Sequence, residues 1–152
     1  MPFESVRFDR VVLVRWVGVP TMADTRELSD LLGRASSAVG QLLLYVAIVP
    51  AALDGVPPAD VRSAMVTGLR DALTKCESID MIMLSEGLAG SMLRTIVRSM
   101  GLMSGMGHKF FIHESSIKAI TRLRTRIQDE NVLKRLQGEL DASSTPVTQL
   151  VR

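Results

Sequence analysis

The spacing most suggestive of ligand chemistry lies in residues 85–90, Ser-Glu-Gly-Leu-Ala-Gly. Ser85, Gly87 and Gly90 occupy the positions of a dinucleotide-binding loop whose first glycine has become serine. Backbone N–H groups at a helix start attract phosphate, but Glu86 would place a negative charge beside it. Such a loop also belongs to the first βα unit, and this one comes late. A capped helix whose glycines allow close packing is therefore favoured, with phosphate binding as the alternative.

His113 stands at the end of the last expected strand, where α/β sheets commonly bind ligands. Asp54, Glu86 and Glu114 could share that edge and form an acid/base cluster with the imidazole. A general base needs an identified partner at hydrogen-bonding distance, and the spacing supplies none. We therefore expect His108 and His113 to be structural or surface residues. His113 is kept as a candidate ligand-binding residue together with the 85–90 loop.

Four soft or nitrogen-bearing side chains follow one another as Met100, Met103, Met106 and His108. Thioether and imidazole ligands suit a soft ion such as Cu(I). A cytosolic copper site would normally include a thiolate or a denser array, whereas methionine at this spacing is typical of apolar packing. We expect no metal and no other cofactor here. The stretch is interpreted as an apolar loop suited to contact with a partner.

A run of basic residues lies between Glu114 and Asp129, namely Lys118, Arg122, Arg124 and Arg126. Nucleic-acid binding would need clustered bases together with aromatic or loop contacts. Acidic residues nearby leave the C-terminal region only weakly basic, so a solvated helix face is the favoured interpretation and nucleic acid is not an expected partner.

Composition is that of one globular domain of 152 residues, with 47% hydrophobic and 22% charged residues and a net charge of +2. No apolar run approaches the roughly 20 residues that cross a bilayer, and the N-terminus does not resemble a signal peptide. The single cysteine, Cys76, excludes an intrachain disulfide and is typical of a reducing compartment. We expect a cytoplasmic protein without membrane insertion, and Cys76 as a small, partly buried residue.

Hydrophobic periodicity predicts alternating strands and helices. Strands are expected at residues 5–8, 11–17, 41–49, 79–84 and 109–113. Helices are expected from Thr21 to Gly40, after Pro57-Pro58, from Ser85 to Gly101, from Ser115 or Ser116 onward, and over 132–140. The fourth of these helices is expected to turn Ile117, Ile120, Leu123 and Ile127 inward. The order predicts an α/β domain with a mixed, mostly parallel sheet of about five strands flanked by helices. Residues 1–127 would form the domain, 128–141 an additional helix and 142–152 a flexible tail.

With that order, the chain resembles the STAS domains (sulfate transporter and anti-sigma-factor antagonist) and their SpoIIAA-like relatives, over residues 5–123. Three stretches carry the resemblance: residues 11–18 followed by Thr21, residues 79–102, and residues 110–119 with the sequence FFIHESSIKA. Phosphorylatable members carry an Asp-Ser-Ser-Gly-like segment after the central strand. The corresponding residues here, 49–58, read VPAALDGVPP and contain no serine. The resemblance thus implies a bacterial protein-interaction module without that phosphorylation switch.

The expected function is a non-enzymatic regulatory or scaffold module that contacts another protein or a second copy of itself, most simply as a homodimer. It would present its first or second helix and the 49–58 loop, while the terminal helix covers the domain or joins two copies. The expected contact residues are Asp54, Val56, Met103, Met106, Leu133 and Leu136. The alternative is a small-molecule, nucleotide or lipid-binding protein with a pocket at the carboxyl ends of the strands, near residues 85–90 and His113.

Overall fold

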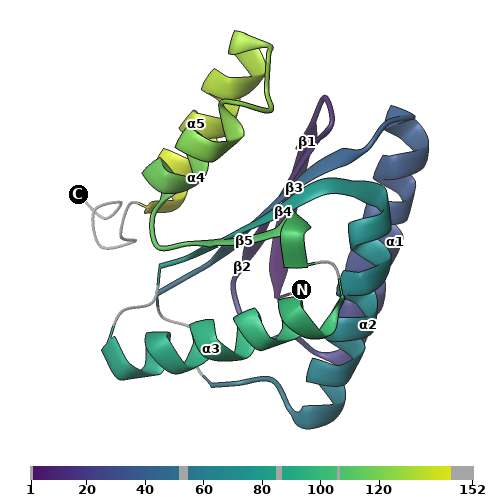
Figure 1. The fold of residues 1–152 in the computed structure, drawn as a ribbon, viewed down its shortest axis with the longest axis vertical. Coiled ribbons are helices and arrows are strands. Elements are labelled where there is room, and N and C mark those ends of the chain that lie inside the picture. The colour runs from purple at the N-terminus through teal and green to yellow at the C-terminus, as the bar shows by residue number, and fades with distance from the viewer. Residues whose placement is uncertain (1, 52–54, 85–86, 106, 145–152) are drawn as a thin grey trace.

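Five strands form one mixed sheet, in the order β1-β2-β3-β4-β5. The computed structural model describes residues 2–51, 55–84, 87–105 and 107–144 (Figure 1). The strands are β1 (Phe3–Phe8), β2 (Val11–Trp16), β3 (Leu43–Val49), β4 (Cys76–Met83) and β5 (Phe110–His113). β1 and β2 are antiparallel and meet in a tight turn in which Asp9 has a φ of 53°. The other strands run parallel to β2, which confirms the expected hairpin followed by βα units.

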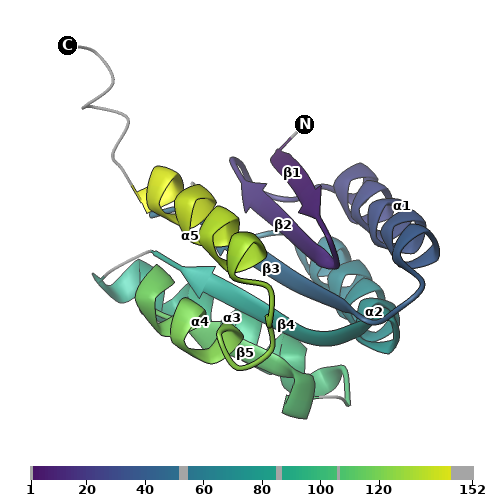
Figure 2. The same ribbon diagram turned by 90° about the horizontal axis from the view of Figure 1, so that it is seen from above.

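Helices cover the sheet on both faces (Figures 1 and 2). One layer contains α1 (Met22–Val39), α2 (Ala59–Lys75) and α3 (Gly87–Met103), and the other contains α4 (Ser116–Leu123) and α5 (Glu130–Ser144). A short 3-10 turn, Gly107–Lys109, leads into β5. Each parallel crossover from β2 to β5 passes through α1, α2 or α3, and the strands follow one another in chain order across the sheet. These three helices therefore lie on one face, and α4 and α5 cover the other.

The apolar core is divided by the sheet into two clusters, because successive side chains of a strand point to opposite faces. Every residue of β3 is buried, as its continuous apolar run predicts for a central parallel strand. Within that strand Tyr45 and Ala47 pack toward α1–α3, whereas Leu44 and Val46 pack toward α4 and α5. The central strand therefore stabilises both layers.

The start of α1 confirms the capping box expected from the sequence. Thr21 Oγ1 accepts a hydrogen bond from the Asp24 backbone N–H, and the Asp24 carboxylate accepts one from the Thr21 N–H. The helix ends at Gly40, in the left-handed region with a φ of 70°. Both boundaries are local features, and both lie where the residue types indicate.

The end of α3 differs from the expectation, because Gly101 lies inside the helix and is not its C′ residue. A Cβ built on Gly101 would lie 2.5 Å from Cδ1 of the Phe110 ring. Glycine is required there for close approach of β5 to the helix, and Gly105, with a φ of 77°, is the turn glycine.

The last two helices also differ in part from the expectation. Ile117 was expected to face inward but is 79% exposed, because Ala119, Ile120 and Leu123 form the buried side of α4. The helical region of α5 extends to Ser144, so three residues assigned to the tail are helical. Residues 145–152 lie outside the described part of the chain.

Strand β4 begins at Cys76, earlier than predicted, and follows α2 without a loop. Cys76 is fully buried, and burial raises the pKa of its thiol to about 12 despite the nearby Lys109 and Lys75. The thiol is therefore protonated and unreactive at neutral pH. Within the described ranges, no helix combines the length and apolar character needed to cross a membrane.

Candidate functional site

A buried carboxylate lies in the middle of the sheet, where an apolar side chain would be expected. Asp80 belongs to β4, is 0% exposed and pairs in register with Val46 on one side and Phe111 on the other. Its neighbours Ile79 and Met81 pack toward α1–α3, so Asp80 points to the α4 side of the sheet. A carboxylate buried in this way requires charged and hydrogen-bonding partners.

Both oxygens of Asp80 accept hydrogen bonds, from His113 and Arg122, which are distant in sequence, and from the nearby Ser78. Oδ1 lies 2.6 Å from Arg122 Nε and 2.7 Å from His113 Nε2. Oδ2 lies 2.5 Å from Arg122 Nη2 and 3.2 Å from Ser78 Oγ. Because an ionised carboxylate only accepts, the contact with His113 requires the proton on Nε2. We call Ser78, Asp80, His113 and Arg122 the Asp80 network.

Arg122 links this network to the helix layer. It lies in the last turn of α4, and its planar guanidinium makes the two-pronged contact that arginine forms with carboxylates. The same group donates to Ser78 Oγ at 2.6 Å and stacks over the Phe111 ring at 4.0 Å from the centroid. Its side chain is only 19% exposed, so its guanidinium interacts mainly with groups inside the domain.

Electrostatics keep Asp80 ionised in spite of its burial. Burial alone raises the pKa of a carboxyl group, but hydrogen bonds and charge from Arg122 and His113 outweigh it and hold the pKa of Asp80 below its ordinary value. The ionised form is therefore stabilised by folding. Its contribution to stability is present above the unfolded-state pKa and is lost as the pH falls through the lower folded-state pKa.

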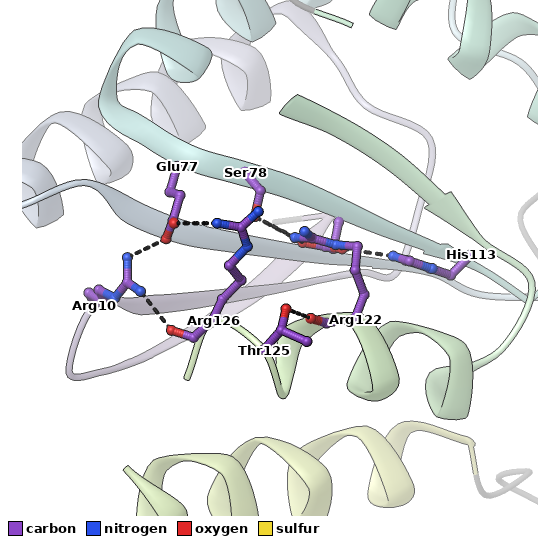
Figure 3. Close-up of polar contacts among 8 residues, drawn as sticks. Arg10, Glu77, Ser78, His113, Arg122, Thr125 and Arg126 are labelled. Atoms are coloured by element: carbon purple, nitrogen blue, oxygen red, sulfur yellow. Dashed lines mark hydrogen bonds and ion pairs between the residues drawn. The ribbon is translucent and has the colours of Figure 1, made fainter. Parts of the chain in front are cut away.

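A second set of ion pairs lies beside the first at the amino-terminal end of β4 (Figure 3). Glu77 pairs with Arg10 at 2.6 Å and with Arg126 at 3.2 Å. Arg10 also donates to the Arg126 carbonyl at 2.8 Å, and Thr125 Oγ1 donates to the Arg122 carbonyl at 2.8 Å. These contacts connect the β1–β2 turn, β4 and the end of α4. They are partly exposed, so each is expected to contribute little to stability.

The basic run between Glu114 and Asp129 is thus not simply a solvated helix face. Arg122 and Arg126 bind carboxylates of β4, and Lys118 pairs with Glu114 at 3.3 Å. Arg124 is exposed. Arg122 is thus the member of the run whose charge is enclosed, whereas the side chains of Lys118 and Arg126 are 63% and 50% exposed, as expected for a solvated helix face.

The Asp80 network contains Ser, His and Asp, but their order is not that of a nucleophilic triad. In such a triad the histidine links the serine to the carboxylate. Here Ser78 Oγ contacts Asp80 and Arg122, and His113 contacts the same carboxylate from the other side. The carboxylate has no lone pair left for a substrate. The geometry therefore indicates a structural role, in which the Asp80 network holds β4, β5 and α4 together.

The predicted ligand residues are only partly brought together. Gly87 begins α3 with a φ of 73° and lines a shallow polar pocket with Glu114 at the carboxyl ends of β4 and β5. Gly90 is buried within α3. His113 turns away from that pocket to bind Asp80. Ser85 and Glu86 lie outside the described residues.

The predicted contact residues are also divided. Val56 is 44% exposed and Met103 is 65% exposed, whereas Asp54 and Met106 lie outside the described residues. Leu133 and Leu136 are 2% and 0% exposed, so they are core residues and not the surface residues expected. They pack in the cluster beneath α4 and α5, because the terminal helix uses its apolar side to cover the sheet.

The described members of the methionine–histidine series, Met100, Met103 and His108, differ in their exposure. Met100 is buried in the core beneath α3, whereas Met103 and His108 are exposed. Among the described residues, no group of three or more His, Cys, Asp or Glu side chains is placed to hold a metal.

Sequence reasoning missed Asp80 altogether. The available signal was a lone acidic residue inside an apolar strand, between Ile79 and Met81. An acidic residue in such a strand is either exposed or buried beside a partner of opposite charge. The basic residues of the helix that follows the last strand were the candidates for that partner.

No family model matches the chain, and no curated protein matches it significantly. Among solved structures, the chain is similar to an anti-sigma factor antagonist from Mycobacterium paratuberculosis. The TM-score is 0.51 and the sequence identity 14%, over 80% of this chain and 92% of that chain. At this identity the likeness concerns the fold, and it confirms the expected STAS-like arrangement.

Proposed function

We propose that the protein is a non-enzymatic regulatory module that acts in the cytoplasm by binding another protein or a second copy of itself. The fold shared with an anti-sigma factor antagonist supports a role of this class. The Asp80 network supports it further, since its acidic and basic groups are used to hold the domain together. The absence of serine from residues 49–58 means that binding would not depend on phosphorylation there.

The observation that carries the proposal is a group of exposed apolar side chains on α3. Met92, Leu102 and Met103 are 57%, 71% and 65% exposed, and we call them the α3 outer surface. Between them, Thr95 and Ser99 donate their hydroxyl groups to carbonyls of the same helix, at 3.0 Å and 2.9 Å. Because these hydroxyl groups already donate within the helix, burying them against a partner would not leave their hydrogens without an acceptor. The surface is therefore suited to contact with a protein.

Methionine is well suited to such a contact because its flexible, polarisable side chain adapts to the shape of a partner. The surface lies on the third helix, whereas the sequence favoured the first or second. Of the expected contact residues, Met103 belongs to it. Val56 is exposed as well, but in the loop before α2, and is a second candidate contact.

Self-association is tested by sedimentation velocity over a concentration series. The wild type is expected to form a dimer, and the triple variant Met92→Glu/Leu102→Glu/Met103→Glu to remain monomeric. Ile117→Glu is the matched control, because Ile117 is more exposed than any of the three and lies on α4. A wild-type monomer at the highest concentration would remove the homodimer from the proposal and leave binding to another protein.

A further inference from the structure

Two adjoining apolar cavities lie between the sheet and the α1–α3 layer. The first has a free volume of about 70 Å³ and the second about 50 Å³. Trp16, Met65, Met81 and Met100 line both of them. The two cavities are therefore separated by a shared set of side chains, three of which are methionines. We call them the Trp16 cavities.

The size of the Trp16 cavities suits a small ligand. A cavity of about 150 Å³ lined by apolar side chains stays dry and binds benzene. Neither Trp16 cavity reaches that volume alone, but the two together approach it. Methionine is unbranched and rotates about three side-chain bonds, so the shared methionines can move at low energetic cost to join the spaces.

Tyr45 gives the first cavity a polar group. Its side chain lines that cavity and is 3% exposed, yet its hydroxyl makes no hydrogen bond to any residue that the structure describes. No fully enclosed side-chain nitrogen or oxygen in the described part of the chain lacks a hydrogen-bond partner. The Tyr45 hydroxyl must therefore border open space, and the cavity supplies it. Burial raises the pKa of Tyr45, so the group is a neutral donor.

Part of the lining of the first cavity comes from half-buried residues of α1 and α2. Its outer lining includes Thr25 and Ser29 from α1 and Gly68 from α2, all of which are half-buried. Gly68 adds no side chain to this seam, and a Cβ there would already contact Ser29 Oγ at 3.8 Å.

We infer that the Trp16 cavities bind a small, mainly apolar molecule, an aromatic ring or short alkyl chain, with one hydrogen-bond acceptor facing the Tyr45 hydroxyl. The site lies on the opposite face of the sheet from the Asp80 network. Its second cavity reaches the carboxyl ends of β2, β3 and β4 through Trp16, Val49 and Met83. Neither cavity is lined by Gly87, Gly90 or His113, the described residues that were expected to line a pocket at that edge. It does not depend on the protein-interaction role.

The test uses p-cresol and toluene as probes, because they differ by one hydroxyl group. Trp16 is the only tryptophan in the chain, so its fluorescence reports on the site directly. Both probes are expected to give a saturable change, with p-cresol binding about fivefold more tightly through one added hydrogen bond. Methyl NMR of ¹³C-labelled methionine then locates the probe. The signals of Met65, Met81 and Met100 should shift, and those of Met92 and Met103 should not.

Tyr45→Phe separates the polar contact from the cavity itself. It removes one oxygen and keeps the ring, so the folded variant should bind toluene as before and lose the preference for p-cresol. Met103→Leu is the control and should change neither affinity. The inference is overturned if neither probe gives a saturable response, or if the exposed methionines shift as much as the three lining ones. A preference that survives in Tyr45→Phe would overturn the role of the hydroxyl.

Discussion

The two faces of the sheet are stabilised by different kinds of interaction. Toward α4 and α5, Asp80 is fixed by Arg122 and His113 through short, directional, charged hydrogen bonds. Toward α1–α3 the packing is apolar and rich in methionine, and it leaves the Trp16 cavities. Directional bonds specify one arrangement, whereas loosely packed methionines tolerate several. We therefore expect the α4 face to be the rigid side of the domain and the α1–α3 face to be the adaptable side.

The largest effect is expected from breaking the rigid face at Arg122. Arg122→Met keeps much of the side-chain volume but leaves the Asp80 carboxylate buried without its main partner, which should cost about 3–5 kcal/mol of unfolding free energy. Urea denaturation measures it. Arg124→Met, an exposed neighbour, should change the stability by less than about 0.5 kcal/mol. Equal effects of the two substitutions would show that the Asp80 network does not stabilise the domain.

An intermediate effect is expected at the contact between α3 and β5. Gly101→Ala forces a methyl group against the Phe110 ring and should destabilise by about 1–3 kcal/mol. Gly138→Ala is the matched control, since Gly138 lies in α5 with no atom near the added Cβ, and it should stabilise by about 0.5–1 kcal/mol. Thermal unfolding of both variants tests the pair. A neutral Gly101→Ala would mean that the adaptable face moves the ring aside without loss.

These two glycines illustrate what the sequence predicts and what it does not. The buried run of β3 and the capping box at Thr21 were predicted because each depends on neighbouring residues. Gly101 was misassigned because its role depends on Phe110, which returns to it from the next strand. Asp80 and Arg122 are 42 residues apart, and no local pattern indicates that they meet. Periodicity thus predicts the elements, whereas the site depends on side-chain pairs between them.

A smaller effect is expected from acid. Because folding lowers the pKa of Asp80, the carboxylate contributes stability above its unfolded-state pKa of about 4, and this is lost as the pH falls through the folded-state value. Urea denaturation at a series of pH values between 5 and 2 measures the unfolding free energy of the wild type and of Asp80→Asn. The loss of unfolding free energy as the pH falls should be smaller in the variant than in the wild type. An identical pH dependence in the variant and the wild type would contradict the assignment.

The smallest effect is expected at the partly exposed ion pairs. Glu77→Gln weakens the contacts with Arg10 and Arg126 and should cost only about 0.5–1 kcal/mol, a loss that salt reduces further. Denaturation at low and high salt measures it. A loss as large as that of Arg122→Met would show that the rigid face depends on both sets of ion pairs equally.

The central claim, that the α3 outer surface binds a protein, is tested most directly by affinity capture with quantitative mass spectrometry. Tagged wild type, the triple variant at Met92, Leu102 and Met103, and Ile117→Glu serve as baits in an extract that also contains an untagged copy of the chain. We expect a protein, or the untagged copy, to be captured by the wild type and by Ile117→Glu and to fall at least about tenfold with the triple variant, as the loss of a central apolar contact implies. Capture that is equal for all three baits, or absent for all, would contradict the account.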